Sequence, residues 1–165
     1  MKISFELNGR PTSLEIEPRE TLAEVLRYRC RLTGVKLSCE SQVCGTCTVL
    51  VDNFPVSACT YLAYEARDKR VTSIEGLAEG VGRLHPLQQA FLDNFAFQCG
   101  FCTPGMILAA KSLLDQNARP SDEEIIAHMS GNLCRCTGYW GILKAIRQAA
   151  AELQGKPREN GRKRG

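Results

Sequence analysis

Eight of the nine cysteines in this chain fall into two separate groups of four, and this grouping limits what the chain can fold around. Four thiolates are the full set of ligands that one iron–sulfur cluster or one structural zinc ion takes. The first cysteine set is Cys39, Cys44, Cys47 and Cys59, and the second cysteine set is Cys99, Cys102, Cys134 and Cys136. The sequence therefore predicts two metal centres, with these eight residues as the metal ligands.

The first cysteine set has the pattern C-x4-C-x2-C, followed by eleven residues and a fourth cysteine. This is the spacing of plant-type [2Fe-2S] ferredoxins, in which three thiolates share one tight loop and the fourth comes from a later segment. A structural zinc site more often has two similar C-x2-C pairs. Gly45 lies in the tight turn, where backbone N–H groups can point at the sulfur atoms and stabilise negative charge. We therefore predict a [2Fe-2S] cluster at this set.

The second cysteine set has a different pattern, C-x2-C and then C-x-C after thirty-one residues. This spacing is less specific, because both zinc and iron accept four thiolates in tetrahedral geometry. By spacing alone, zinc remains an alternative to an iron–sulfur cluster here.

The length and composition are those of a globular protein. A chain of 165 residues can bury roughly 70% of its unfolded surface, enough for one large domain or two small ones. The first nine residues lack the features of a signal peptide, and no apolar stretch approaches the eighteen or so residues of a membrane span. We therefore expect a cytoplasmic protein without a membrane span, since in a reducing compartment grouped thiols are more often metal ligands than disulfides.

The net charge of +3 says little about partners. Five basic residues against one glutamate give the last ten residues a charge of +4, which leaves the first 155 residues near −1. A basic tail could contact nucleic acid, but this one has no aromatic residues and is rich in glycine. We therefore expect the tail to be disordered and predict no nucleic-acid partner.

The N-terminal half shows the apolar–polar alternation of β-strands, interrupted by one helical segment. Turn pairs at Asn8–Gly9 and Asp52–Asn53 each separate two alternating runs, a pattern typical of hairpins. Two hairpins around one helix favour a β-grasp fold. The expected elements are a hairpin over residues 2–16, a helix from a capping box at Thr21 to about Cys30, a hairpin over residues 48–57 and a strand over residues 70–74.

From about residue 84 the apolar period changes from two to between three and four, which predicts helices. The expected helices begin near Pro86, at Thr103–Pro104 with Thr103 as the N-cap, after a capping box at Ser121, and near Gly141. We therefore expect an α+β protein with a β-grasp, plant-type ferredoxin domain over residues 1–76, a linker over 77–83, a four-helix domain over 84–154 and a basic tail over 155–165.

Two segments around the second cysteine set carry a family resemblance. QCGFCTPGM at residues 98–106 and GNLCRCTGY at residues 131–139 closely resemble signatures of the small iron–sulfur subunit of the molybdenum hydroxylases, the family of xanthine dehydrogenase, aldehyde oxidase and carbon monoxide dehydrogenase. With the first cysteine set and the domain order, the resemblance covers roughly residues 2–150. It implies that the helical domain, peculiar to this family, also binds a [2Fe-2S] cluster.

The resemblance also implies a function. The chain would be the electron-transfer subunit of a molybdenum-dependent oxidoreductase acting on an aldehyde, an N-heterocycle or a similar small carbon centre. A large partner subunit would hold the molybdenum-pterin cofactor and a medium subunit FAD, in a hetero-oligomer such as a dimer of heterotrimers. The second cysteine set would lie nearer molybdenum and the first nearer flavin. Gln98 matches the glutamine that hydrogen-bonds the pterin, although by itself it could equally cap local backbone.

No catalytic residues are expected on this chain, because it contains no Ser/His/Asp grouping and no nucleotide-binding fingerprint. The alternative is a free-standing two-cluster ferredoxin, although a free carrier is usually strongly acidic. A zinc-dependent nucleic-acid module is a third interpretation, based only on the tail and the cysteine count.

Other residues have simpler predicted roles. Ser38 and Gln42 stand where relatives commonly have glycine, and Thr46 where they have alanine, so the first cluster loop can differ in its hydrogen bonds. The remaining expectations are an inert Cys30 in the core, capping or packing roles for His85 and His128, shielding of the second cluster by Phe101, Tyr139 and Trp140, and core positions for Phe91, Phe95 and Phe97.

Overall fold

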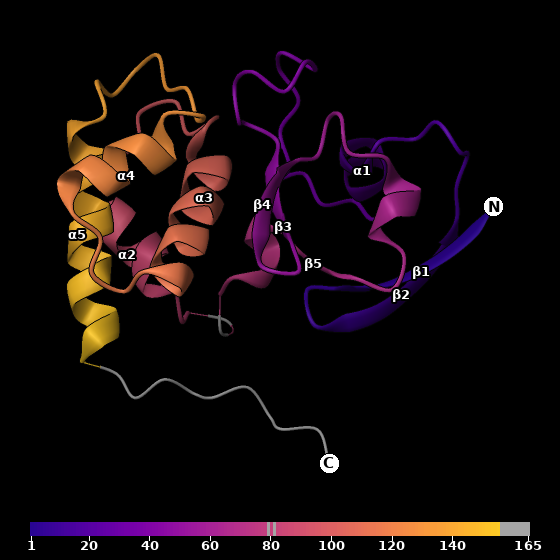
Figure 1. Cartoon of the computed structure of the whole chain (residues 1–165), viewed down its shortest axis with the longest axis horizontal. Helices are drawn as coiled ribbons and strands as arrows, with labels where there is room; N and C mark the ends of the chain where they lie inside the picture. Colours follow the sequence, from indigo (N-terminus) through magenta and orange to yellow (C-terminus); the bar gives the residue numbers. More distant parts are fainter. Residues whose placement is uncertain (79, 81, 156–165) are drawn as a thin grey trace.

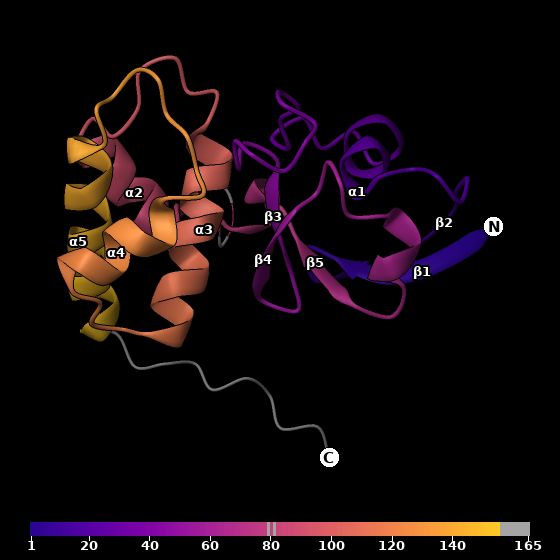
Figure 2. The same ribbon diagram turned by 45° about the horizontal axis from the view of Figure 1, so that its top comes forward.

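The computed structural model describes residues 1–78, 80 and 82–155. A sheet half and a helical half lie side by side, and the two views in Figures 1 and 2 agree on this arrangement. Helix α3 (Thr103–Gln116) contacts strands β3 (Thr48–Val51) and β4 (Phe54–Ser57), so the two halves are packed directly against each other. The α+β class expected from the sequence is confirmed.

The N-terminal half is a five-stranded mixed sheet in the order β2-β1-β5-β3-β4. Strands β1 (Lys2–Leu7) and β5 (Arg70–Thr72) pair in parallel, while the other neighbours are antiparallel. Strand β2 (Arg10–Glu15) is the partner of β1 in the first hairpin. This topology confirms the predicted β-grasp fold.

Both hairpins turn where the sequence indicates. Asn8 and Gly9 have φ values of +50° and +76°, and Asp52 and Asn53 have +50° and +69°. Positive φ at both central residues is the requirement of a type I′ turn, which matches the twist of the flanking strands. Strand β5 ends at Thr72 rather than Ile74, because the Ser73 N–H donates to the Asn8 side chain instead of to a neighbouring strand.

The predicted helix over residues 21–30 forms, but its second half has a different pitch. Helix α1 (Leu22–Glu24) begins at the Thr21 capping box and continues as a π-helical turn over Val25–Arg29. The Cys30 N–H donates to the Val25 carbonyl at 3.0 Å, the wider bonding pattern of a π-turn. The apolar period of the sequence could not distinguish the two pitches over so short a segment.

The C-terminal half contains the four predicted helices: α2 (Pro86–Asp93), α3, α4 (Asp122–Met129) and α5 (Trp140–Gln154). His85 caps α2 through its side chain, and Ser121 begins α4 in a capping box, both as expected. The prediction of Thr103 as the N-cap of α3 is wrong. Cys102 occupies that position and already has helical dihedral angles, so Thr103 is the first residue of the helix.

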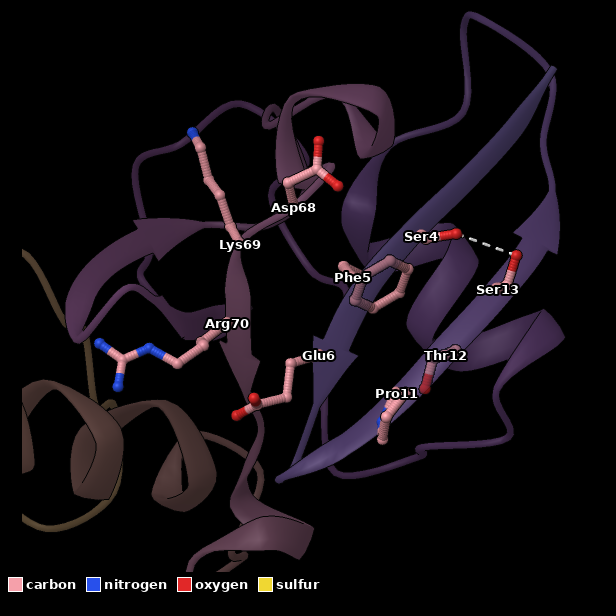
Figure 3. Close-up of a pocket in the computed structure, with 9 residues that line it drawn as sticks. All are labelled: Ser4, Phe5, Glu6, Pro11, Thr12, Ser13, Asp68, Lys69 and Arg70. Atoms are coloured by element: carbon pink, nitrogen blue, oxygen red, sulfur yellow. Dashed lines mark hydrogen bonds between the residues drawn. The ribbon is translucent and has the colours of Figure 1, made fainter. Parts of the chain in front are cut away.

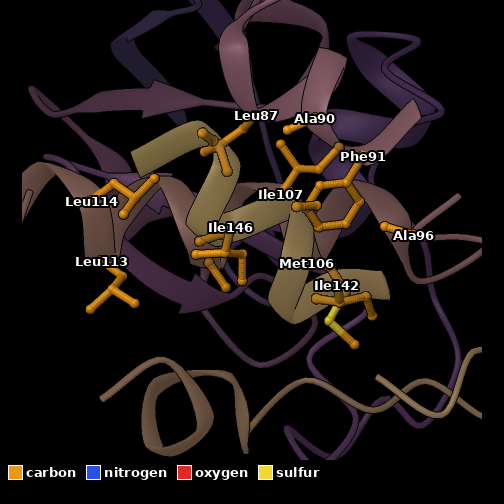
Figure 4. Close-up of a cluster of buried hydrophobic side chains, with 14 of the residues drawn as sticks. Leu87, Ala90, Phe91, Ala96, Met106, Ile107, Leu113, Leu114, Ile142 and Ile146 are labelled. Atoms are coloured by element: carbon orange, nitrogen blue, oxygen red, sulfur yellow. The ribbon is translucent and has the colours of Figure 1, made fainter. Parts of the chain in front are cut away.

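Each half has its own apolar core. The helical core contains the almost fully buried Phe91, and Figure 4 shows this ring beside Ile107 and Met106. Phe97 is half-buried. The predicted core position of Phe95 is wrong, because α2 has ended and the residue takes a φ of +48°, which leaves its side chain 86% exposed.

Parts of the predicted domain division lie outside the described residues. Residues 156–165 of the predicted tail over 155–165, and residues 79 and 81 of the predicted linker, fall there, so the boundaries remain a prediction. Within the part of the chain that the structure describes, no helix has the length and apolarity needed to cross a membrane.

Candidate metal centre

The β3–β4 hairpin organises the first cysteine set. Cys47 directly precedes β3 and Cys59 follows β4, and the antiparallel pairing of Thr48 with Ser57 brings these two ends together. Both side chains are buried, with 3% and 7% exposure. Cys39 and Cys44 lie in the loop before β3 and are half-buried. The fold therefore gathers one buried and one more accessible pair of thiols.

Backbone N–H groups in this loop stabilise negative charge on the Cys39 sulfur. The Cys44 N–H donates to the Cys39 sulfur at 3.4 Å. Hydrogen bonds from the backbone N–H groups of Ser41 and Cys44 lower the pKa of Cys39 to about 6. At the buried pair, desolvation is the largest cause that raises the pKa of Cys47 to about 12, and the adjacent Cys59 thiol adds to it. A bound metal cation would offset the cost of ionising this buried thiol, because the thiolate is the form that ligates metals.

Gln42 shows how the loop accommodates a residue where glycine was expected. Its φ is +64°, so a non-glycine residue here takes the left-handed conformation itself. The side-chain amide oxygen Oε1 of Gln42 accepts a hydrogen bond from the Thr60 hydroxyl at 3.2 Å, and Thr60 is the neighbour of Cys59. This side chain therefore ties the first loop to the segment of the fourth cysteine.

The second cysteine set comes from two loops of the helical half. Cys99 and Cys102 lie in the turn that leads into α3, and Cys134 and Cys136 lie between α4 and α5. The sulfur atoms of Cys99 and Cys136 are 3.6 Å apart. Burial and the adjacent Cys134 thiol raise the pKa of Cys102 to about 12. The four thiols therefore form two pairs, Cys99 with Cys136 and Cys102 with Cys134.

Polar groups around Cys134 stabilise its charged form. The Thr137 hydroxyl donates to the Cys134 sulfur at 3.2 Å, and the Cys134 N–H donates to the Tyr139 hydroxyl at 2.8 Å. Burial opposes ionisation, but the hydroxyl and N–H of Thr137 and the N–H of Cys136 outweigh it and lower the pKa of Cys134. In contrast, the Cys99 thiol raises the pKa of the exposed Cys136.

The pairing of the thiols suits a cluster with two metal atoms. Two thiolates bound tetrahedrally to one metal at about 2.3 Å lie about 3.8 Å from each other. The 3.6 Å separation of the Cys99 and Cys136 sulfur atoms is close to that value. No group of three or more Cys, His, Asp or Glu side chains is gathered closely enough for a single metal ion within residues 1–78, 80 and 82–155.

The buried Thr103 hydroxyl beside the second cysteine set is a possible hydrogen-bond donor to a cluster. Thr103 follows Cys102, and among the described residues its Oγ1 is buried without a hydrogen-bond partner. An unpaired buried hydroxyl costs free energy. A cluster bound by Cys102 would place sulfur acceptors near this hydroxyl. From the sequence, Thr103 was assigned only a helix-capping role and Thr137 no role, although each directly follows a cysteine of the second set, which was a usable signal.

The other residues considered in the sequence analysis make contacts that do not involve the two thiol sites. His85 caps α2, and His128 lies 3.0 Å from both the Ser112 hydroxyl and the Ala109 carbonyl. Cys30 packs against the sheet core, and burial raises its pKa. Gln98 is exposed, so its predicted contact with a pterin remains a prediction.

Aromatic side chains lie close in sequence to the second cysteine set, but they are not buried over it. Phe101 and Trp140 are exposed in this chain, and Trp140 stacks against the side chains of Lys144 and Arg147. Shielding of a cluster by these two rings would therefore need a partner surface to cover them. Tyr139 is half-buried and contributes the hydroxyl contact with Cys134.

A hollow in the sheet half is separate from both cysteine sets. Figure 3 shows it over β1, β2 and the start of β5, with Ser4 and Ser13 hydrogen-bonded at 3.1 Å across the hairpin. Its lining contains no cysteine or histidine.

Comparison with known proteins agrees with this two-part organisation. Residues 5–76 match a 2Fe-2S iron–sulfur cluster binding domain, and residues 73–147 match a second family, described as a [2Fe-2S] binding domain. The fold and the two cysteine sites therefore define a two-domain [2Fe-2S] protein.

The relatives narrow the class further. The chain is 50% identical to the nicotinate dehydrogenase small FeS subunit of Eubacterium barkeri, over 89% of this chain and 93% of that subunit. The crystal structure of quinoline 2-oxidoreductase from Pseudomonas putida 86 contains a chain that is 47% identical, with a TM-score of 0.89 over 92% of this chain and 94% of that one. The chain belongs to the small iron–sulfur subunits of the molybdenum hydroxylase family and is an electron-transfer subunit of an oxidoreductase.

Some relatives carry this unit within a longer chain. The aldehyde oxidoreductase of Desulfovibrio desulfuricans ATCC 27774 is 41% identical, with a TM-score of 0.90 over 93% of this chain but only 17% of that chain. In that protein the same fold is one part of a larger polypeptide, whereas other relatives are separate small subunits.

Proposed function

We propose that this chain relays single electrons through two [2Fe-2S] clusters between a molybdenum-pterin site and FAD, both held by partner subunits. The observation that carries the proposal is the presence of two complete sets of four thiols, each arranged in two pairs. Each cluster, when bound, accepts and releases one electron, so two of them can divide a two-electron oxidation into single steps. Within this chain, the thiolates hold the clusters and the nearby N–H and hydroxyl groups stabilise their negative charge.

We also propose a direction for the relay. The second cysteine set would face the molybdenum-pterin subunit and the first set the FAD subunit. Support comes from the exposed Cys99 and Cys136 and from the exposed Phe95, Phe101 and Trp140 in neighbouring segments. A concentration of exposed aromatic side chains is typical of a protein–protein interface. Gln98, also exposed, would hydrogen-bond the pterin at this interface.

The substrate would be oxidised on the large partner subunit. Because the relatives are named for nicotinate, quinoline and aldehyde, an N-heterocycle or an aldehyde is the proposed substrate class. A hetero-oligomer in the cytoplasm, such as a dimer of heterotrimers, would be the working form.

The test is the iron, zinc, molybdenum and flavin content of the complex that co-purifies with this chain from its native host. We expect four irons per chain, together with molybdenum and flavin. Four irons without molybdenum or flavin would contradict the proposal and favour a free two-cluster ferredoxin. Zinc in place of iron at either site would contradict the cluster assignment.

Thr137 provides a test of how this chain tunes the second cluster. In Thr137→Val the hydroxyl that donates to Cys134 is lost, and a donor to a thiolate stabilises the reduced, more negative cluster. We expect a reduction potential lower by about 60 mV, the one-electron equivalent of about 1.4 kcal/mol. An EPR-monitored redox titration measures it. Thr137→Ser keeps the hydroxyl and should stay near the wild-type potential; equal shifts in both variants would refute this role.

A further inference from the structure

The helical half contains a buried hydroxyl that its own fold leaves without a partner. Among residues 1–78, 80 and 82–155, two buried side-chain polar atoms lack a hydrogen bond, the Nε of Arg27 and the Oγ1 of Thr103. Arg27 still donates to the Thr33 carbonyl at 3.2 Å through its Nη1. Thr103 has no other polar atom in its side chain. Its hydroxyl therefore carries the full cost of burial unless a group outside the polypeptide accepts its proton.

Other buried hydroxyls of this chain are satisfied by backbone carbonyls. The Thr48 hydroxyl donates to the Gly45 carbonyl at 2.6 Å. Ser112, which lies on the same helix as Thr103, is fully buried, and its hydroxyl donates to the Ala109 carbonyl at 2.9 Å. This bond to the preceding turn is the usual solution for a hydroxyl within a helix. At the start of α3 the Gly100 carbonyl accepts the backbone N–H of Thr103 instead, at 3.3 Å.

The unpaired hydroxyl belongs to the residue next to the inner thiol pair of the second cysteine set. Cys102, which precedes Thr103, and Cys134 both pack against the helical core, whereas Cys99 and Cys136 are exposed. Hydrogen bonds are electrostatically stronger in such a partly desolvated place, because the local dielectric constant is lower. A donor beside the inner pair therefore has a larger effect on bound negative charge than one beside the outer pair.

The first turn of α3 has few other donors to offer. Backbone N–H groups at the start of a helix commonly serve as donors to a nearby anion. Here the Thr103 N–H is already bonded to the Gly100 carbonyl, and Pro104 has no N–H. The Thr103 hydroxyl is therefore the donor that remains at the first two positions of this helix.

We propose that the Thr103 hydroxyl donates a hydrogen bond to a sulfur atom of the cluster held by the second cysteine set, and that this bond makes the cluster easier to reduce. Reduction adds one electron and increases the negative charge on the sulfur atoms, so a donor stabilises the reduced form more than the oxidised form. The electron comes from substrate oxidation on the partner subunit, and the hydroxyl keeps its proton throughout. The inference rests on the proposed two-cluster function and adds a residue that sets the potential of one cluster.

Three variants separate the hydroxyl from the rest of the side chain. Thr103→Val removes the hydroxyl at nearly constant volume, and Thr103→Ser keeps the hydroxyl but lacks the methyl group. Ser112→Ala is the matched control, because it removes a buried hydroxyl from the same helix that already has a carbonyl partner. Each variant is prepared as the assembled complex, and its iron content is measured first. An EPR-monitored redox titration then gives the potential of each cluster, and ENDOR in H2O and D2O records the exchangeable protons near the reduced second cluster.

We expect Thr103→Val to retain four irons and to show an approximately tenfold smaller equilibrium constant for reduction of the second cluster, equivalent to about 60 mV for one electron. One exchangeable proton coupling should disappear from its ENDOR spectrum. The potential of the first cluster should not change, and Thr103→Ser and Ser112→Ala should match wild type. A wild-type potential or an unchanged set of proton couplings in Thr103→Val would overturn the inference, as would equal shifts in Thr103→Val and Thr103→Ser.

Loss of the second cluster from Thr103→Val would also be decisive, with Thr103→Ala as the second variant. If Thr103→Ala keeps the cluster, its potential and proton couplings decide in the same way. If Thr103→Ala also loses the cluster while Thr103→Ser keeps it, the hydroxyl is required to hold the cluster, which supports the bond. If Thr103→Ser loses it as well, the side chain serves only the folding of this segment, and the inference is rejected. Fewer than four irons in the wild-type complex would instead refute the proposed function.

Discussion

Replacing Cys136 with serine is expected to remove one of two distinguishable reduced-cluster EPR signals and to stop electron flow to the partner subunits. Cys136 is paired with Cys99, with 3.6 Å between the sulfur atoms, so the substitution removes half of one thiol pair. Serine does not replace the thiolate, because its hydroxyl stays protonated at neutral pH. The signal of the first cysteine set should remain, since its four thiols lie in the other domain. EPR of the reduced complex, together with iron analysis, measures the result.

The ninth cysteine provides the control. Cys30 packs against the sheet core rather than among the thiol pairs, and Cys30→Ala should retain four irons and both signals. If Cys136→Ser also keeps both signals, the ligand assignment of the second cysteine set is wrong. If Cys30→Ala loses a signal, this thiol has a role that its position does not indicate.

The second large effect concerns the core beneath the second site. Phe91→Ala should lower the free energy of unfolding by about 3–5 kcal/mol, the usual cost of deleting a buried aromatic ring. Phe91 is only 1% exposed and lies in the helical core with Met106 and Ile142 (Figure 4). Domains of this size are stable by about 5–15 kcal/mol, so much of the stability is lost. Urea unfolding followed by circular dichroism, with loss of cluster absorbance recorded in parallel, measures the change.

Phe95→Ala is the matched control for this experiment. The same residue type four positions later is 86% exposed, so its truncation should change stability by no more than about 0.5 kcal/mol. Similar unfolding midpoints for the two variants would show that the helical core is not packed as described.

The features that could be predicted from the sequence are those set by neighbouring residues. Turn pairs such as Asn8–Gly9 supply the positive φ values that a tight hairpin needs, and the capping boxes at Thr21 and Ser121 satisfy N–H groups within the same turn. The close spacing of Cys39, Cys44 and Cys47 likewise indicates that these three residues lie on a single loop. Elements and cysteine groupings of this kind follow from local geometry, and the structure contains them.

The predictions for Phe95 and Thr103 are wrong because contacts with distant residues override the local sequence pattern there. Phe95 continues the apolar period of α2, yet the chain leaves the helix after Asp93 and turns its ring to the surface. Thr103–Pro104 resembles a helix start, yet Cys102 is already helical. Both segments flank the loop that carries Cys99 and Cys102. At the end of α2, the Ala96 N–H donates to the Phe91 carbonyl at 2.9 Å and the Asn94 side chain donates to the Gln148 side chain of α5 at 2.6 Å, so contacts beyond the local helix pattern end the helix there.

The sequence by itself determined that this chain has two four-thiol sites, a β-grasp half and a four-helix half, because ligand count, spacing and periodicity are properties of short segments. Only the tertiary structure decided which thiols pair and where the two loops meet. The contact of Asn132 with Gly45 joins residues 87 positions apart, and no local pattern encodes it. Such contacts depend on how α3 packs against β3 and β4, which is set by the shape of whole surfaces rather than by any single motif.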